Sequence, residues 1–419
     1  MKLALTNAVV VNGSDAAPRR GLTVAIEGNS ISSVAERLDP DPETHVVDLD
    51  GLTVMPGLID CHIHFALWAF ELLGHQEEPI SYLCAKTQRA MADALHEGCT
   101  SARDLGGLDA GFRDAVADGI CPGPRLQTSI TIVSPTNGIA DNTNAQGIRV
   151  PYPPGMPSPE CNGAAEVRAK VRELVRAGAD VIKIAVSGGV NSRRRTPRHR
   201  LFTDDEIAAA VDEAHAWGLR VACHALGGPG PLAAIRAGVD SIEHGAWLDD
   251  TCLREMAERG TWLVPTFAGY AWHETLGGDA QRRYAREMKE SHRASFQRAL
   301  DAGVRVACGS DAGVYGYDFK HELELLVDAG MSAGEAIGAA TSRAADCLGI
   351  ADEVGTLAPG KRADLLVVDG NPCHDIGILR RAGGIRCVFK DGELVRDELG
   401  LAVPSAAEMR TSRVVSAAV

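Results

Sequence analysis

Histidine, lysine and aspartate stand where several short apolar segments of the chain end. The first of these segments ends in His62-Ile63-His64. Side chains alternate along a β-strand, so both imidazoles face the same side and together form half of a metal site. Later segments of the same kind contain or end in single polar residues, namely Lys183, His224, His244 and Asp311.

A lone histidine at a strand end is more often a hydrogen-bonded residue than a metal ligand. Six polar residues at equivalent heights on five strands are a different case. Apolar strands do not accept buried imidazole and carboxylate without strong compensation, and a metal ion supplies it. The pattern therefore predicts a metal site made of His62, His64, Lys183, His224, His244 and Asp311.

The elements that position these residues repeat along the middle of the chain. Eight short apolar segments lie between about residues 57 and 350, and segments with helical patterns separate them. Thr203 and Glu206 form a capping box at the start of one such helix. Eight strand–helix units predict an α/β protein with a (β/α)8 TIM barrel, whose active site lies at the C-terminal ends of the strands. A doubly wound open sheet is the alternative, but no glycine-rich nucleotide-binding loop follows the first strand.

Both ends of the chain have another pattern. Residues 1–56 and 352–400 contain β-branched runs separated by Asn-Gly and Asp-Gly turns, and Lys390-Asp391-Gly392 is a typical hairpin turn. We expect the two ends to pair into one small composite β-sandwich domain, with the barrel at 57–351 inserted between them. Residues 401–419 are expected to form a C-terminal tail.

The composition excludes several classes of protein. The chain has 419 residues and a formal net charge of −14, which argues against a nucleic-acid-binding protein. No apolar stretch reaches the length of about 18 residues that a membrane span needs, and we identify no signal peptide. The 11 cysteines are scattered without a CxxC pair, which indicates reduced thiols in the cytoplasm. We therefore expect a cytoplasmic protein that acts on a small molecule.

The sequence resembles the amidohydrolase superfamily. The resemblance lies in PGLIDCHIH (56–64), VACHALG around His224, SIEHG (241–245) and GSDA (309–312). EGCTSARDLGG (97–107) and GTLAPGKRADLLVVDG (355–370) extend it over nearly the whole chain. Within the superfamily, VIKIAVSGGV followed by FTDDEI is similar to the prolidase-like and imidazolonepropionase-like branch. That branch includes dipeptidases, ochratoxin-degrading enzymes, and hydrolases of carbamates and phenylureas.

The resemblance implies a binuclear metal centre and a homo-oligomer. A free lysine amine is protonated near pH 7 and cannot bind a cation. Lys183 is therefore expected to be carboxylated by carbon dioxide and to bridge the two ions; an ordinary ion-paired lysine is the alternative. One ion would bind His62, His64, carboxylated Lys183 and Asp311, and the other would bind carboxylated Lys183, His224 and His244. Zinc is the expected metal, and cobalt, manganese or nickel would also suit these ligands.

The expected reaction is hydrolysis of an amide-type C–N bond in an N-acyl amino acid, a dipeptide, or a xenobiotic amide, urea or carbamate. A hydroxide that bridges the two ions would attack the carbonyl, with Asp311 as general acid and base. The resemblance also implies that Tyr270 hydrogen-bonds the scissile carbonyl and that His199 lies near the substrate. Five arginines within residues 193–200 could bind a carboxylate or form a solvated lid. Three tryptophans follow strand ends and could line an apolar pocket, namely Trp68, Trp247 and Trp272.

Two other functions fit the same fold. A mononuclear deaminase or a cyclic-amide or imide hydrolase is the first, but such relatives usually lack the strand-four lysine. A non-catalytic barrel is the second, and it should have lost one or more of the six polar residues. Many prolidase-like relatives carry Gly-Gly-His-Gly-Asp after strand three, where this chain has residues 134–141 without a histidine. That departure shifts the expected substrate from dipeptides toward a non-peptide amide, urea or carbamate.

Overall fold

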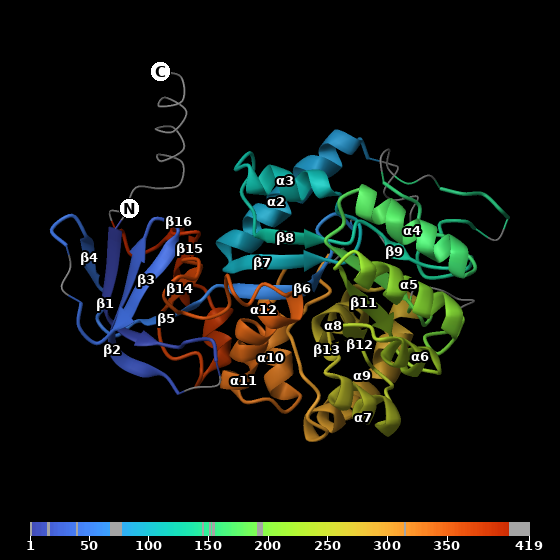
Figure 1. The fold of residues 1–419 in the computed structure, drawn as a ribbon. Helices are drawn as coiled ribbons and strands as arrows, with labels where there is room; N and C mark the ends of the chain where they lie inside the picture. The colour runs from blue at the N-terminus through green and yellow to red at the C-terminus, as the bar shows by residue number, and fades with distance from the viewer. Residues whose placement is uncertain are drawn as a thin grey trace, which may run out of the picture. The chain divides into compact units, whose positions relative to one another are not determined.

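The computed structural model describes residues 2–14, 17–38, 41–67, 78–144, 146–150, 152, 156–190, 196–313 and 316–401 (Figure 1). The chain divides into two compact units. The first contains Met1–Ile59, Ala92–Ser101 and Leu326–Val419, and the second contains Asp60–Met91 and Ala102–Leu325.

The first unit contains an eight-stranded sheet in the order β16-β15-β14-β5-β1-β2-β3, with β4 beside β1. Strand β14 pairs antiparallel with β5, so strands from both chain ends lie in one sheet (Figure 1). Its strands are β1 (Lys2–Val10), β2 (Arg19–Glu27), β3 (Ser30–Ala35), β4 (His45–Asp48), β5 (Thr53–Pro56), β14 (Leu365–Val368), β15 (Ile385–Lys390) and β16 (Glu393–Asp397). We predicted that this domain is a β-sandwich and that it consists of residues 1–56 and 352–400. Both statements stay predictions.

Residues spaced by two supply the core of this sheet. Leu3 and Leu5 of β1 and Leu365 and Val367 of β14 belong to one buried cluster, because alternate side chains of a strand share a face. The predicted turn between β15 and β16 is present. Asp391 and Gly392 have φ angles of 50° and 74°, as the two central residues of a type I′ hairpin turn require.

The second unit is built on parallel strands. One sheet has the order β6-β7-β8 and the other the order β13-β12-β11-β10-β9. Two parallel pairings complete a ring, because Val306 pairs with Leu263 of β13 and Ala312 pairs with Ile63 of β6. The strands are β6 (Leu58–Ile63), β7 (Cys99–Asp104), β8 (Arg125–Thr128), β9 (Ile132–Val133), β10 (Val181–Ala185), β11 (Arg220–Ala225), β12 (Ser241–His244) and β13 (Trp262–Val264).

This ring confirms the predicted α/β architecture with parallel strands. Seven of the eight predicted barrel strands have a counterpart among the described strands, and the third is divided into β8 and β9. The eighth is represented by the paired residues Val306 and Ala312, and we refer to this segment as strand eight. Ile130, between those two pieces, has a φ of 65°, and such a left-handed residue interrupts the extended backbone.

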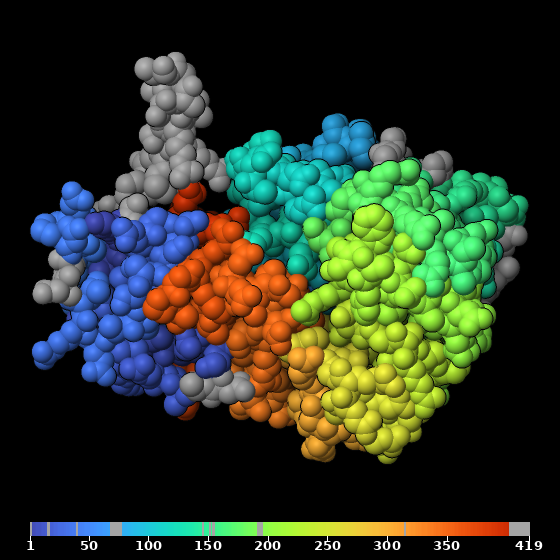
Figure 2. Space-filling view, viewed as in Figure 1, coloured from blue at the N-terminus to red at the C-terminus, as the bar shows by residue number. Residues whose placement is uncertain are grey.

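Helices connect the strands, and α4 to α7 form part of the outer surface in the view of Figure 2. The capping box at the start of α5 is present, with Thr203 accepting from the Glu206 backbone N–H. Within the described residues, no helix has the length and apolar character needed to cross a membrane. The helices are α2 (Ile80–His96), α3 (Ala110–Ala117), α4 (Ala164–Arg176), α5 (Asp204–Ala216), α6 (Gly230–Ala237), α7 (Asp250–Arg259), α8 (Phe267–Leu276), α9 (Asp279–Asp301), α10 (Lys320–Asp328), α11 (Ala333–Ala339), α12 (Ser342–Leu348) and the 3₁₀ helix η1 (Ile376–Leu379).

Candidate active site

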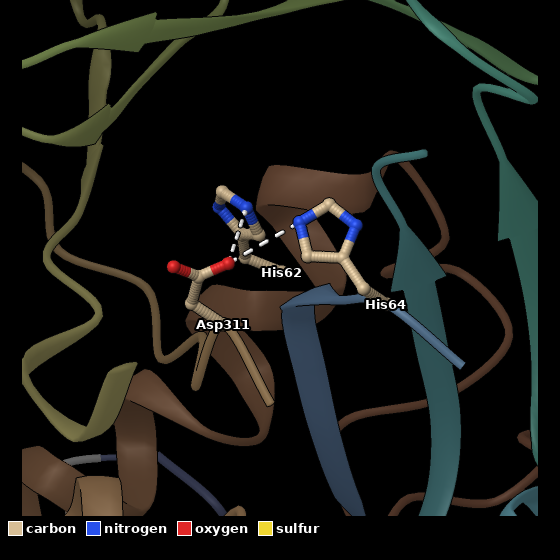
Figure 3. Close-up of side chains that lie close together, drawn as sticks. All are labelled: His62, His64 and Asp311. Atoms are coloured by element: carbon tan, nitrogen blue, oxygen red, sulfur yellow. Dashed lines mark ion pairs between the residues drawn. The ribbon is translucent and has the colours of Figure 1, made fainter. Parts of the chain in front are cut away.

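Three of the predicted metal ligands converge at the C-terminal end of β6. The Nε2 atoms of His62 and His64 lie 3.4 Å and 3.2 Å from Oδ1 of Asp311 (Figure 3). One potential ligand atom from each residue lies within 4.8 Å of the other two. Both histidines are buried, whereas the Asp311 side chain is 19% exposed. The cluster is therefore shielded on the strand side and accessible through Asp311.

The backbone brings strand one and strand eight together at this point. The Asp311 N–H donates to the His62 carbonyl at 2.7 Å. Gly309 permits this approach, because a Cβ atom there would lie only 2.8 Å from the Cβ of His62. A glycine two residues before the aspartate is therefore required by the packing of the two strands.

The other three predicted ligands lie on the neighbouring strands β10, β11 and β12. The rings of His224 and His244 are 4.6 Å apart, and those of His62 and His244 are 5.0 Å apart. Lys183 is 1% exposed, and its Nζ has no hydrogen-bond partner among the described residues. Burying an amine without a hydrogen-bond partner costs free energy. Carboxylation of Lys183, or a ligand bound to its Nζ, would remove that cost.

The tautomers of the His62 and His64 rings follow from their hydrogen bonds. His62 Nδ1 donates to the Glu243 carboxylate at 2.7 Å, and His64 Nδ1 donates to the Gly106 carbonyl at 2.8 Å. With the proton on Nδ1, the lone pair of each neutral ring is on Nε2, the atom that faces Asp311.

The next two histidines are held in the same way. His224 Nε2 donates to the Gly188 carbonyl at 3.2 Å, which leaves the lone pair on Nδ1. His244 Nδ1 lies 2.7 Å from the Thr266 hydroxyl, so its Nε2 is the nitrogen left for a ligand. Each imidazole thus has one nitrogen fixed by a second group, as metal-bound histidines do.

A buried ion pair supports this arrangement. Glu243 accepts hydrogen bonds from Arg103 Nη2 at 3.0 Å and from the Ser241 hydroxyl at 2.5 Å, while also accepting from His62. Burial alone would raise the pKa of Glu243, but the charges of Arg103 and Lys183 and the hydrogen bond to His62 together outweigh it and hold that pKa at about 2. The carboxylate is therefore ionised and can only accept hydrogen bonds, which fixes His62 as the Nδ1–H tautomer.

Burial keeps the imidazoles of His62 and His224 neutral. It lowers the pKa of His62 to about 4 and that of His224 to about 3. Burial also lowers the pKa of Lys183 to about 8. For Asp311, burial would raise the pKa, but hydrogen bonding and charge at His64 and His62 lower it below its ordinary value. At neutral pH the cluster therefore presents the Asp311 carboxylate and the uncharged imidazoles of His62 and His224.

Three lone-pair-bearing atoms that converge in a buried site repel one another unless a cation or a proton lies among them. In the absence of a metal ion, burial would lower the pKa of His64, but the Asp311 and Asp104 carboxylates and the Gly106 carbonyl together raise it. A divalent cation would satisfy the same atoms together, and imidazole with carboxylate is a donor set that zinc and similar metals prefer. His62, His64 and Asp311 therefore fit a divalent metal ion, as the sequence predicted for these three residues.

Comparison with known proteins identifies the family. The sequence profile of the amidohydrolase family matches residues 53–395. The chain belongs to the amidohydrolase family. It is 31% identical to the ochratoxinase of Aspergillus niger over 423 aligned positions, which cover 94% of this chain and 87% of the fungal protein.

Two solved structures are similar over nearly the whole chain. A Xaa-Pro dipeptidase with methionine bound in its active site has a TM-score of 0.85 and 33% identity, covering 94% of this chain and 99% of that one. A prolidase complexed with N-methylphosphonate-L-proline has a TM-score of 0.87 and 30% identity, covering 95% of this chain and all of that one. These similarities confirm the predicted family and a TIM-barrel-type fold. They also confirm that this amidohydrolase is a hydrolase acting on C–N bonds.

Tyr270, predicted from the family resemblance, lies beside this cluster in the amidohydrolase. Its ring is 5.8 Å from that of His244, and the residue is 8% exposed. Burial, reinforced by the negative charge of Asp311, raises the pKa of Tyr270 well above 10. The phenol is therefore protonated at any working pH and can donate a hydrogen bond.

Helix α8, which carries Tyr270, approaches Asp311 closely. A Cβ atom at Gly269 would lie 2.9 Å from Asp311 Oδ2, so only glycine fits there. The first helical residues, Phe267 and Ala268, donate their backbone N–H groups to the buried carboxylate of Glu322 at 3.0 Å and 2.7 Å. Glu322 thus takes the place of the N-cap side chain of α8. Thr266, the residue at the N-cap position, instead contacts His244 through its hydroxyl.

Three consecutive strand ends carry residues in the left-handed backbone region. His244, Thr266 and Asp311 have φ angles of 73°, 57° and 54°. Such residues other than glycine cost on the order of 1 kcal/mol each, and they concentrate at functional sites. His244 and Asp311 are predicted ligands, and the Thr266 hydroxyl contacts His244. This agrees with a site whose geometry is maintained at some cost in stability.

The loop after β10 contains the other predicted substrate residue, His199. Its side chain is exposed, its Nδ1 accepts from the Thr196 backbone at 3.2 Å, and its carbonyl accepts from Gly188 at 3.0 Å. No contact in the described structure links the His199 side chain to the histidine cluster, so its role stays a prediction. Trp68 and residues 193–195 lie outside the described residues, and Trp272 is partly buried in α8.

The residues that support the predicted ligands were not among the sequence predictions. Arg103, Glu243 and Glu322 are each 1% exposed or less. A charged residue inside an apolar strand is a usable signal, because it must be paired when buried. Arg103 in CTSARDLG and Glu243 in SIEH both meet that criterion. Glu322 gives no comparable signal, because its helix is amphipathic and its partners lie on another helix.

Proposed function

We propose that this amidohydrolase cleaves an amide-type C–N bond at a binuclear metal centre. One divalent ion would bind His62, His64, carboxylated Lys183 and Asp311, and the other would bind carboxylated Lys183, His224 and His244. The single observation that carries the proposal is the convergence of the His62, His64 and Asp311 lone pairs in a buried site.

The state of Lys183 supports its carboxylation. The amine is buried and has no hydrogen-bond partner among the described residues. Carbon dioxide reacts with neutral amines, and burial favours the neutral form of Lys183. The resulting carbamate would replace an uncompensated amine with an anion suited to bridging two cations.

Divalent ions supply a nucleophilic water at neutral pH and polarise the substrate carbonyl. The remaining steps belong to side chains of the chain. Asp311 is ionised, so it can accept a proton from the attacking water and deliver it to the leaving nitrogen. Tyr270 is protonated and can donate to the carbonyl oxygen as negative charge develops there.

The substrate class follows from the chemistry of the centre and from the relatives. An N-acyl amino acid, a dipeptide, and a xenobiotic amide, urea or carbamate all contain a carbonyl bonded to nitrogen. The named activities of the ochratoxinase and of the Xaa-Pro dipeptidase support this range. Zinc is the proposed metal, while cytoplasmic location and homo-oligomeric assembly stay predictions.

The test is a hydrolysis panel with the zinc-loaded protein. We expect release of amine from at least one N-acyl amino acid, dipeptide, arylurea or carbamate. Asp311→Asn should lower kcat by about 100- to 10,000-fold, the range for loss of a general acid or base. Asp212→Asn is the matched control, because Asp212 is exposed on α5 and pairs with the surface residue Arg168. Ammonia release from an aminated heterocycle, without turnover of the panel, would instead favour the mononuclear deaminase.

A further inference from the structure

Helix α9 supplies buried hydrogen-bond donors to the loop that follows β12. His292 Nε2 donates to the His244 carbonyl at 2.8 Å, and the Ser295 hydroxyl donates to the Gly245 carbonyl at 2.8 Å. His292 and Ser295 are 2% and 0% exposed, and their spacing of three residues places them on one face of the helix. One face of α9 therefore binds two consecutive peptide carbonyls at the end of β12.

The pairing of β12 with the next strand ends just before these carbonyls. The last paired residues of β12 and β13 are Glu243 and Val264. His244 and Gly245 then have φ angles of 73° and 70°. A residue other than glycine is strained in this left-handed region, and it persists there only where surrounding contacts determine its conformation. The hydrogen bond from His292 is such a contact, and it is made to His244 itself.

The His292 ring is itself fixed by packing. It lies 4.2 Å from the Phe267 ring and 5.6 Å from the Tyr270 ring, and it meets the Tyr270 ring at an angle of 85°. Edge-to-face contacts between aromatic rings are favourable and depend on orientation. The N–H group of His292 is therefore held in one direction, toward the His244 carbonyl.

The His244 residue is thus held at two points. Its carbonyl accepts from His292, and its Nδ1 lies 2.7 Å from the Thr266 hydroxyl. The other ring nitrogen, Nε2, is left for the ion that we assign to His224, His244 and carboxylated Lys183. Since the direction of a side chain depends on the backbone that carries it, a change of conformation at His244 would move Nε2 away from that ion.

We propose that His292 is a positioning residue, which acts through the backbone of His244 to direct its Nε2 atom toward the second metal ion. This inference rests on the proposed function and adds to it a residue that touches neither metal ion nor substrate. A histidine that only stabilised the fold would affect the melting temperature alone. His292 should in addition affect one metal site and leave the other unchanged.

The experiment titrates metal-free wild type, His292→Phe and His292→Gln with zinc in competition with a chromophoric chelator. The phenylalanine keeps a ring without the donor, and the glutamine restores an N–H donor at a similar reach. We expect one of the two zinc affinities to weaken about 10- to 100-fold in His292→Phe and to recover in His292→Gln, because supporting contacts of this kind tune metal sites. His215→Phe is the matched control, because His215 is exposed on α5 and pairs with Asp240 at 3.0 Å.

Three results would overturn the proposal. They are unchanged zinc affinities in His292→Phe, equal weakening of both affinities, and a His292→Gln variant as weak as His292→Phe. If His292→Phe does not fold, His292→Asn takes its place with the same expected results, because its shorter amide does not extend as far as Nε2.

A measurement on the metal-free protein separates this proposal from the proposed function. The Gly245 N–H donates to the Ala225 carbonyl at 3.1 Å, and its hydrogen exchange reports on the backbone next to His244. We expect this exchange to be about tenfold or more faster in His292→Phe than in wild type or His215→Phe. A wild type that binds only one zinc ion contradicts the proposed function, and the exchange then decides the role of His292 alone. Equal exchange in wild type and His292→Phe would refute that role.

Discussion

Glu243→Gln tests the idea that a buried ion pair holds the first metal ligand in position. The substitution keeps the shape of the side chain and removes its charge. Arg103 would then lose the Glu243 carboxylate at 3.0 Å, and His62 would lose its ionised acceptor. Loss of one partner of a buried ion pair is strongly destabilising, because the other charge remains unpaired.

The magnitude follows from the pKa of the carboxyl. A fall from the ordinary value of 4.5 to about 2 corresponds to roughly 3 kcal/mol of stabilisation of the charged form. This agrees with the 3–5 kcal/mol typical of a broken buried pair. We therefore expect Glu243→Gln to reduce the free energy of unfolding of the metal-free protein by about 3 kcal/mol at pH 7.

The pH dependence gives the sign of the effect. Because the folded-state pKa is lower than the unfolded one, the stabilisation is fully present above about pH 4.5 and is lost as the pH falls toward 2. The difference between wild type and variant should be constant from pH 7 to pH 5 and should shrink below that. Urea unfolding, followed by tryptophan fluorescence at each pH, measures the free energy of unfolding of the two proteins.

Glu258→Gln is the control for this experiment. Glu258 lies on α7 and faces Arg254 at 4.0 Å, with both side chains more than 60% exposed. Exposed pairs contribute about 0–1 kcal/mol, so this variant should unfold almost as wild type does. If Glu243→Gln also unfolded like wild type at pH 7, the reasoning about the buried pair would be refuted.

Two further substitutions test the helix beside the cluster. Tyr270→Phe should lower kcat by about 10- to 1,000-fold without loss of bound metal, because it removes a hydrogen-bond donor and leaves the ring in place; unchanged kcat would exclude Tyr270 from the reaction. Glu322→Ala should lower both the melting temperature and kcat, because two buried N–H groups at the start of α8 lose their acceptor. Glu335→Ala, which removes the capping-box glutamate of α11, should lower the melting temperature alone. Equal kcat values for Glu322→Ala and wild type would show that α8 does not depend on this cap.

The sequence was sufficient to predict the barrel strands and the cluster that lies at their ends. Period-two alternation places His62 and His64 on one face, and polar residues at the ends of apolar segments identify the neighbouring strands. The three ligands that the structure brings within 4.8 Å come from strands one and eight, which are adjacent only because the barrel closes. That adjacency follows from the fold class rather than from any local pattern.

The supporting residues could not be predicted in the same way. Glu243 is adjacent to His244 in sequence, but its partners are His62 and Arg103 on other strands. Thr266 would ordinarily cap its own helix, yet its hydroxyl binds His244, and Glu322 from α10 replaces it. Which acceptor a buried donor uses depends on three-dimensional packing that local propensities do not encode.

The central claim is that carboxylated Lys183 and the five surrounding ligands hold two metal ions. The most direct test is metal content per chain, measured by elemental mass spectrometry on protein produced with zinc and bicarbonate. We predict about two ions per chain in wild type, as a two-metal hydrolase requires, and at least one fewer in Lys183→Ala, with activity partly restored by a short-chain carboxylate. About one ion per chain in wild type, or full activity of Lys183→Ala, would contradict the binuclear centre.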